Sequence, residues 1–220
     1  MKEWRGLWLP DNEHHLVEWM AQVNKIVRGK PTYQYSKYET ALKLCKNRRR
    51  AIDVGGNIGL WAMHMTYDFD VVEAFEPVTE YAEIFVKNAP DAKLHQVALG
   101  EKEQVVKMVN PTKGSCGDTR PWKEGDPEQA TVENAVTMMT LDAYGFNDVD
   151  LIKIDCEGYE LNVIRGALET IMRNKPVIVV EQKPGHGTIF EKSDTAAIDY
   201  LRSLGMKQYT VLSGDYIMVW

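Results

Sequence analysis

The feature that most constrains the fold is a regular alternation of short apolar runs with helical patterns, which starts near Arg50. Strands are expected at 51–54, 71–75, 94–99, 150–155 and 176–180, with helices after most of them, among them 58–67, 79–88 and about 194–204. Strands that alternate with helices form a mostly parallel sheet with helices on both faces. The sequence therefore predicts an α/β fold of the Rossmann-like, doubly wound kind.

The end of the sequence adds a more specific element. Apolar runs at 206–212 and 216–220 are separated by Ser213-Gly214-Asp215, which predicts an antiparallel hairpin strand on the parallel sheet. A further strand is possible at 104–109, and the turn-rich stretch 110–128 is expected to be a long loop.

The first part of the chain follows a different pattern. Apolar residues at helical spacing come after Asp11 and stop at Gly29-Lys30-Pro31, and a weaker helical pattern covers 36–46. We therefore expect an N-terminal helical extension at 1–37 and one α/β domain at 38–220.

Composition restricts the partners and the compartment. The formal net charge is −6, which disfavours nucleic acid as the main partner, because binding phosphates needs a basic surface. No apolar run reaches the ~18–20 residues of a membrane helix, and the N-terminus lacks the apolar core of a secretory signal. Cys45, Cys116 and Cys156 are far apart and odd in number, which is typical of a reducing compartment. We expect a soluble cytoplasmic protein without a membrane or nucleic-acid partner.

The segment Asp53-Val54-Gly55-Gly56-Asn57-Ile58-Gly59 lies between a predicted strand and a predicted helix. Its glycines let the backbone approach a ligand, but their spacing is neither that of a dinucleotide fingerprint nor that of a P-loop. Glu76 ends the next strand, where a carboxylate can accept hydrogen bonds from both hydroxyls of a ribose. A nucleoside cofactor held without a phosphate clamp suggests S-adenosylmethionine; the alternative is that both features are structural.

Five blocks of the sequence together resemble the FkbM family of methyltransferases, over about residues 38–220. They are A-I-D-V-G-G-N-I-G, F-E-P-V, T-L-D, L-I-K-I-D-C-E-G-Y-E and V-I-V-V-E. The resemblance implies a class I methyltransferase fold, with a seven-stranded sheet whose last strand is antiparallel. It also implies S-adenosylmethionine-dependent O-methylation, usually of hydroxyls on sugars or secondary metabolites.

Eight residues are candidates for holding the cofactor: Asp53, Gly55, Asn57, Gly59, Glu76, Pro77, Ala98 and Leu99. Asp53 is expected to face the cofactor's amino group or the N–H groups of the loop. The loop glycines and Asn57 would line the methionine end, and Glu76 would bind the ribose. Ala98 and Leu99, after the third strand, are expected beside the adenine.

Candidates for catalysis are Lys153, Asp155, Glu157, Glu181 and His186, at or just after the strands at 150–155 and 176–180. Open α/β sheets bind ligands at this edge, and these side chains could serve as a general base, contact the sulfonium or bind a cation. The alternatives are an internal ion pair of Lys153 with Asp155, a helix-dipole role for Glu157 and a solvated loop for His186. Ligand spacing supports no metal, so none is expected.

The expected acceptor is a small molecule, most simply a hydroxyl on a sugar or metabolite. The sequence leaves open a nitrogen or macromolecular acceptor, and also a non-catalytic module that only binds a nucleoside. The segment 114–117 in the expected long loop is a candidate lid over the acceptor.

Overall fold

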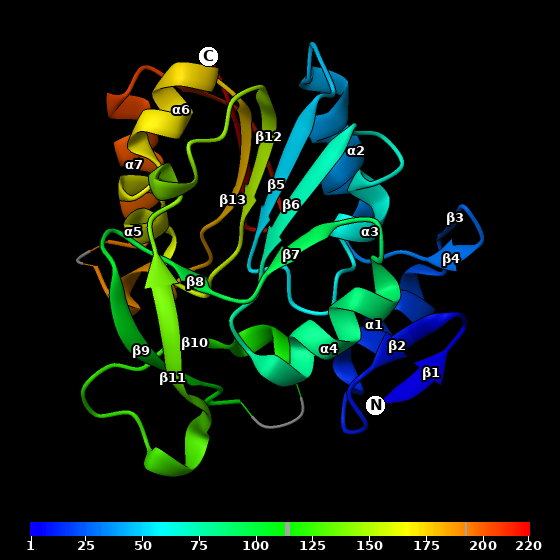
Figure 1. Cartoon of the computed structure of the whole chain (residues 1–220). Coiled ribbons are helices and arrows are strands. Elements are labelled where there is room, and N and C mark those ends of the chain that lie inside the picture. Colours follow the sequence, from blue (N-terminus) through cyan, green and yellow to red (C-terminus); the bar gives the residue numbers. More distant parts are fainter. Residues whose placement is uncertain (113–114, 192) are drawn as a thin grey trace.

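The computed structural model of the chain describes residues 1–112, 115–191 and 193–220, so Gly114 of the candidate lid lies outside the described residues. Its centre is a seven-stranded sheet in the order β14-β15-β13-β12-β5-β6-β7 (Figure 1). The strands are β5 (Arg50–Val54), β6 (Val71–Phe75), β7 (Lys93–His95), β12 (Val149–Ile154), β13 (Val177–Glu181), β14 (Lys207–Leu212) and β15 (Asp215–Val219). Only β15 runs against the others, pairing with β13 and β14. The predicted sheet and its antiparallel hairpin strand are confirmed.

Both faces of the sheet are buried, as a doubly wound fold requires. Along β12, Leu151 belongs to one hydrophobic cluster, whereas Ile152 and Ile154 belong to the other. The second cluster is covered by α5 (Glu160–Arg165), α6 (Leu168–Asn174) and α7 (Ala196–Ser203). The first is covered by α2 (Tyr35–Leu44), α3 (Ala62–Met65) and α4 (Thr79–Asn88). The helix expected at 58–67 is shorter than predicted, because α3 covers only Ala62–Met65.

A second, four-stranded sheet in the order β10-β9-β11-β8 lies beyond the main one. The single strand expected at 94–99 is wrong: the chain turns at Val97, whose N–H donates to the carbonyl of His95. The edge strand β7 ends there, and β8 (Ala98–Leu99) pairs with the unpredicted β11 (Thr131–Met139). The extra strand at 104–109 is confirmed as β9 (Gln104–Val109).

The stretch 110–128 is more ordered than the long loop predicted from its turn residues. Within its described residues it holds a 3-10 helix at Cys116–Asp118 and the short strand β10 (Arg120–Pro121), which pairs with β9. This pairing anchors the stretch against the second sheet.

The N-terminal segment contains more than the two predicted helices. The helix expected between Asp11 and Gly29 is shorter than predicted: α1 covers His15–Val23 and ends at the left-handed Asn24. Ile26 and Val27, expected to be helical, form β3 (Ile26–Val27), which makes a small hairpin with β4 (Lys30–Pro31). A second hairpin, β1 (Lys2–Trp4) with β2 (Leu7–Leu9), precedes α1.

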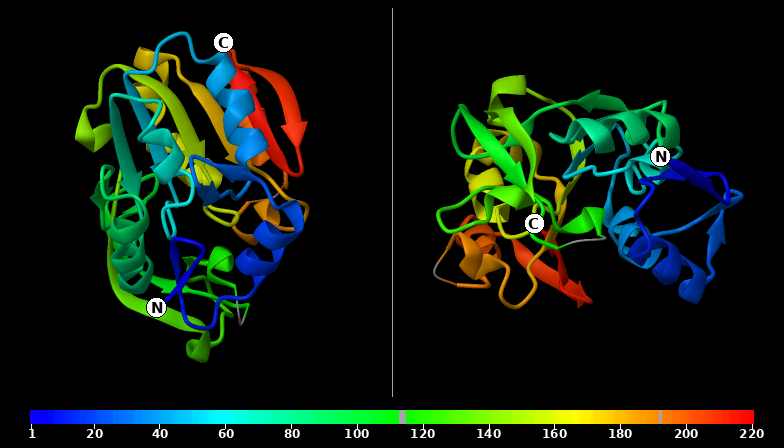
Figure 2. Two further views of the ribbon diagram at one scale, coloured as in Figure 1. Left: turned by 90° about the vertical axis from the view of Figure 1, so that its right-hand side faces the viewer. Right: turned by 90° about the horizontal axis from the view of Figure 1, so that it is seen from below.

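The side chain of Asn88 fastens the hairpin β1–β2 to the main domain. Its Oδ1 accepts from the N–H of Trp8 at 2.8 Å, and its Nδ2 donates to the carbonyl oxygens of Trp8 and Ile58 at 2.8 and 2.7 Å. Figure 2 shows this segment and the second sheet at the same end of the main sheet. The boundary between residues 37 and 38 stays a prediction, and α2 runs across it.

No helix within the described ranges has both the length and the hydropathy needed to cross a bilayer.

Candidate active site

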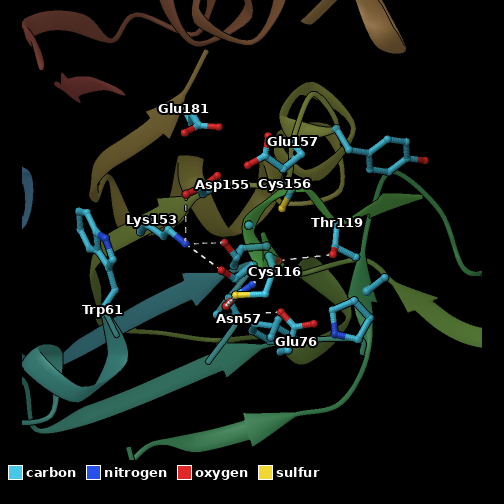
Figure 3. A pocket seen from close by; sticks show the side chains of 18 of the residues that line it. Asn57, Trp61, Glu76, Cys116, Thr119, Lys153, Asp155, Cys156, Glu157 and Glu181 are labelled. Atoms are coloured by element: carbon cyan, nitrogen blue, oxygen red, sulfur yellow. Dashed lines mark hydrogen bonds and ion pairs between the residues drawn. The ribbon is translucent and has the colours of Figure 1, made fainter. Parts of the chain in front are cut away.

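One cavity opens at the carboxyl ends of β5, β6, β12 and β13 (Figure 3). Its walls come from the glycine loop after β5, the residues after β6, the segment Val97–Leu99 and the ends of β12 and β13. The N-terminal segment and the stretch 116–121 close the opposite side. The topology therefore brings most of the predicted site residues to one place.

The glycine loop is held in an unusual backbone conformation. Gly55 has a φ of 71°, and a Cβ on it would lie 2.0 Å from the carbonyl oxygen of Asp155, so no other residue fits there. Asn57 has a φ of 48°. Its Oδ1 accepts from the N–H of Ile58 and its Nδ2 donates to the carbonyl of Cys116, both at 2.8 Å. The loop thus presents Gly55 and Asn57 to the cavity in a fixed shape.

Glu76 is a buried polar group that lines the cavity next to the glycine loop. It is 4% exposed, its Oε2 accepts from the N–H of Asn57 at 2.8 Å, and its Oε1 accepts from the N–H of Val78 at 2.9 Å. Burial raises the pKa of Glu76 to about 7, although these two hydrogen bonds act in the opposite direction. Because each carboxylate oxygen has a second lone pair, Glu76 can still accept from a ligand.

Pro77, Ala98 and Leu99 line the cavity beside Glu76, where they form an apolar wall together with Phe75. Gly59 does not line it: a Cβ there would face the ring of Phe85 at 3.2 Å, so this glycine allows close packing against α4.

Lys153 connects three groups beneath the loop. Its Nζ lies 3.2 Å from Oδ1 of Asp53 and 3.7 Å from Oδ2 of Asp155, and it donates to the carbonyl of Gly55 at 2.8 Å. Asp53 and Lys153 are register partners on adjacent strands. Burial disfavours the charged lysine, but the two carboxylates outweigh it and raise the pKa of Lys153. Asp53 is fully buried in this ion pair and does not line the cavity.

The acceptor side holds a cluster of acids at the ends of β12 and β13. Asp155 keeps a lowered pKa, because Lys153 and Lys183 outweigh the effect of burial. Burial raises the pKa of Glu181 to about 9, and the charges of Asp155 and Glu157 add to this. Nδ1 of His186 lies 2.8 Å from Oε2 of Glu157, and this contact raises the pKa of the histidine.

The turn that carries Glu157 depends on a residue whose role the sequence did not reveal. Glu157 and Gly158 have φ values of 51° and 98°. Oε1 of Glu160 accepts from the N–H groups of Cys156 and Gly158, each at 3.0 Å. Since α5 begins at Glu160, the alternative that Glu157 is a first-turn helix acid is wrong. The only signal for Glu160 in the sequence was its place as the last residue of the L-I-K-I-D-C-E-G-Y-E block.

Apart from Cys116, which belongs to the candidate lid 114–117, the remaining wall comes from residues to which no sequence pattern assigned a place in the site. Leu16 and Tyr33 of the N-terminal segment line the cavity, as do Trp61 and Cys116. Oε2 of Glu13 accepts from the N–H of Cys116 at 2.9 Å, which joins the N-terminal segment to the stretch 116–121. These contacts depend on tertiary structure, so local spacing could not predict them.

Comparison with known proteins shows which proteins this chain is similar to. Methyltransferase 1 of Beauveria bassiana (strain ARSEF 2860) is 27% identical over 141 residues, which are 52% of this chain and 57% of that protein. Precorrin-6y C5,15-methyltransferase from Geobacter metallireducens GS-15 superposes with a TM-score of 0.51 and 13% identity, covering 89% of this chain and 92% of that one, and so shares the fold. Methyltransferase FkbM from Methylobacillus flagellatus KT has a TM-score of 0.49 and 18% identity, covering 78% of this chain and 43% of that one.

The chain thus spans less than two thirds of the fungal relative and of the Methylobacillus protein. The family model described as the methyltransferase FkbM domain matches residues 53–207, which is more than half of the chain and includes the glycine loop, Glu76 and the acid cluster. The chain therefore belongs to the FkbM family of methyltransferase domains.

Proposed function

We propose that this chain is an S-adenosylmethionine-dependent methyltransferase that acts on a hydroxyl of a sugar or another small metabolite. One observation carries the proposal: a single cavity places Glu76 and the glycine loop on one side and the strand-end acids on the other. The first set suits a nucleoside, and the second suits a cation and an acceptor that must lose a proton.

The residues present fit the cofactor by their chemistry. Glu76 offers buried acceptors to ribose hydroxyls, and the apolar wall with Pro77, Ala98 and Leu99 suits an adenine ring. Gly55 and Asn57 would line the methionine end. S-adenosylmethionine, when bound, supplies a methyl group on a positively charged sulfur, which is already a good leaving group.

Asp155 is the proposed proton acceptor, because it lines the cavity and the ammonium groups of Lys153 and Lys183 lower its pKa and keep its carboxylate ionised. Glu157 and Glu181 line the same side and would orient the acceptor. Lys153 is a positioning residue, since its contacts fix Asp53, Gly55 and Asp155 relative to one another.

A small acceptor is supported by the closure of the cavity. Leu16, Tyr33 and Trp61 cover one side and the stretch 116–121 another, which restricts access for a polymer. The net charge of −6 further disfavours a nucleic-acid acceptor.

The test combines calorimetry with a screen for methyl transfer. The chain should bind S-adenosylmethionine and S-adenosylhomocysteine but not NAD, and should then label a hydroxyl compound from a labelled methyl donor. If the labelled methyl group appeared only on amines, proteins or RNA, the acceptor would not be a hydroxyl compound and that class would take its place. Cofactor binding without any transfer would indicate a nucleoside-binding module, and tight NAD binding would overturn the proposal.

A further inference from the structure

Three side chains of metal-ligating type converge at the acceptor end of the cavity. Glu157, Glu181 and His186 each bring one candidate ligand atom to within 4.8 Å of the other two. They come from the turn after β12, the end of β13 and the loop that follows β13, so their spacing in the sequence gives no sign of a shared site.

Glu181 has an unsatisfied oxygen inside this cluster. The side chain is 2% exposed, and its Oε1 pairs with Nζ of Lys183. Its Oε2 has no hydrogen-bond partner among the described residues. A buried carboxyl oxygen without a partner is costly, so a ligand that reached Oε2 of Glu181 would stabilise it.

The contact between His186 and Glu157 has a similar character. Nδ1 of His186 lies 2.8 Å from Oε2 of Glu157, yet it is buried and not aligned for a hydrogen bond to that oxygen. Two ligand atoms that are this close without an aligned hydrogen bond can both bind one cation. A cation would satisfy this pair and Oε2 of Glu181 together.

The backbone around the cluster is fixed. A Cβ on Gly158 would lie 2.3 Å from the carbonyl oxygen of His186, so the turn after β12 and the loop after β13 pack directly on each other. Asp194 accepts from the N–H groups of Gly185 and Thr188 at 2.8 and 3.1 Å, which holds the histidine loop. Together with the bonds to Glu160, these contacts preorganise the three ligands.

We propose that Glu157, Glu181 and His186 bind one divalent first-row transition cation such as Mn²⁺ or Zn²⁺. Metal–ligand distances of about 2.1 Å put ligand atoms at most about 4.2 Å apart, so small side-chain rotations are enough to close the site. The imidazole favours these ions over Mg²⁺, which prefers oxygen ligands.

The role of the cation rests on the proposed function. Three protein ligands leave coordination positions free, and Glu157 and Glu181 line the cavity, so these positions face the acceptor. A hydroxyl bound there becomes more acidic, and its proton is removed more easily. The acceptor class is therefore a hydroxyl compound that can bind a cation.

The experiment measures metal binding directly and needs no acceptor. The purified chain is freed of metal with a chelator and titrated with Mn²⁺, and unbound Mn²⁺ is followed by electron paramagnetic resonance. We expect one Mn²⁺ per chain, and an affinity at least tenfold lower in Glu181→Gln and in His186→Asn. Glu80→Gln and His15→Asn change exposed residues of the same types and should bind like the wild type.

Melting temperatures separate a lost site from a lost fold. Mn²⁺ should raise the melting temperature of the wild type and of both controls, but not that of folded Glu181→Gln or His186→Asn. Glu157→Gln serves as a replacement if either variant fails to fold. The inference would be overturned if the wild-type chain did not bind one Mn²⁺ per chain. It would also be overturned if the substitutions at Glu181 and His186 left the Mn²⁺ affinity unchanged.

Calorimetry with S-adenosylmethionine on the metal-free chain keeps the two proposals apart. Cofactor binding without Mn²⁺ binding overturns the metal site alone. Mn²⁺ binding without cofactor binding supports the metal site and overturns the proposed function.

Discussion

The two halves of the cavity are built in different ways. On the cofactor side, the hydrogen bond from Asn57 to Glu76 joins residues 19 apart in the sequence. In the wall that closes the cavity, the bond from Cys116 to Glu13 joins residues 103 apart, and the carbonyl of Cys116 accepts from Asn57. The glycine loop and Glu76 thus form a local motif on two neighbouring strands, whereas the wall that closes the cavity is assembled from distant segments.

Their electrostatics differ as well. The cofactor side relies on one carboxylate, Glu76, whose oxygens already accept backbone N–H groups. The acceptor side groups Asp155, Glu157 and Glu181 with the ammonium groups of Lys153 and Lys183. Under the proposed function, hydrogen bonds to a fixed loop would recognise the nucleoside, and charge would be concentrated where the methyl group is transferred.

The largest effect is expected from Lys153, which lies between the two halves. Lys153→Met leaves the fully buried Asp53 without its ion-pair partner, and should cost about 3–5 kcal/mol of unfolding free energy. Denaturant unfolding measures this. Lys102→Met, at an exposed position, should change little, and the double variant with Asp53→Asn should recover part of the loss. If Lys153→Met and the wild type had the same unfolding free energy, the ion pair of Lys153 with Asp53 would not contribute to stability.

Glu76 tests the cofactor side alone. Glu76→Ala should weaken S-adenosylmethionine binding by about 1–3 kcal/mol, the cost of losing hydrogen bonds to a charged acceptor. Calorimetry measures the affinity, with exposed Glu80→Ala as the matched control. An unchanged affinity would place the ribose elsewhere.

The pH dependence of cofactor affinity sharpens the same assignment. The pKa of Glu76 is raised to about 7 in the folded chain, so its carboxyl is mostly protonated at pH 6 and mostly ionised at pH 8. If the ionised form binds the ribose, affinity should fall by up to about tenfold from pH 8 to pH 6, and Glu76→Gln should abolish the fall.

Linkage gives the opposite sign for the stability of the ligand-free chain. Because the folded pKa of Glu76 is raised, its contribution to stability is complete below the unfolded value and is lost as pH rises through about 7. This group should therefore make the free chain less stable at pH 7.5 than at pH 5, measured as the difference between wild type and Glu76→Gln. A contribution that grows with pH would contradict the raised pKa.

Glu13 tests the wall that closes the cavity. Glu13→Gln keeps the size of the side chain but replaces one of the oxygens that accept from Leu16 and Cys116. Losing one such bond costs about 1 kcal/mol, so the KM for the acceptor should rise up to about fivefold while cofactor affinity stays constant. Exposed Glu3→Gln is the control. Weaker cofactor binding in Glu13→Gln would show that the two sides are not separate.

The sequence was sufficient for the parallel sheet, because short β-branched runs such as 176–180 that alternate with helical patterns are typical of strands buried on both faces. It failed where tertiary pairing overrides local pattern. The break at Val97 and the strand β11 depend on each other, since Ala98 pairs with Met138, and neither is visible in isolation.

The site shows the same division. Glu76 and the glycine loop were predictable, because each occupies a fixed place at a strand end. Tyr33, Glu13 and Glu160 were not, because their roles arise from contacts with distant segments or with a strained turn. Asp53 was expected to face the cofactor's amino group or the N–H groups of the loop, and instead lies beneath the loop in an ion pair with its register partner Lys153.

Calorimetry of S-adenosylmethionine binding to the wild type, Glu76→Ala and Glu13→Gln tests the separation of the two halves most directly. We expect one cofactor site per chain, an affinity for S-adenosylmethionine about five- to 150-fold weaker in Glu76→Ala, and an unchanged affinity in Glu13→Gln. Equal affinities in all three, or a loss in Glu13→Gln with none in Glu76→Ala, would contradict this expectation.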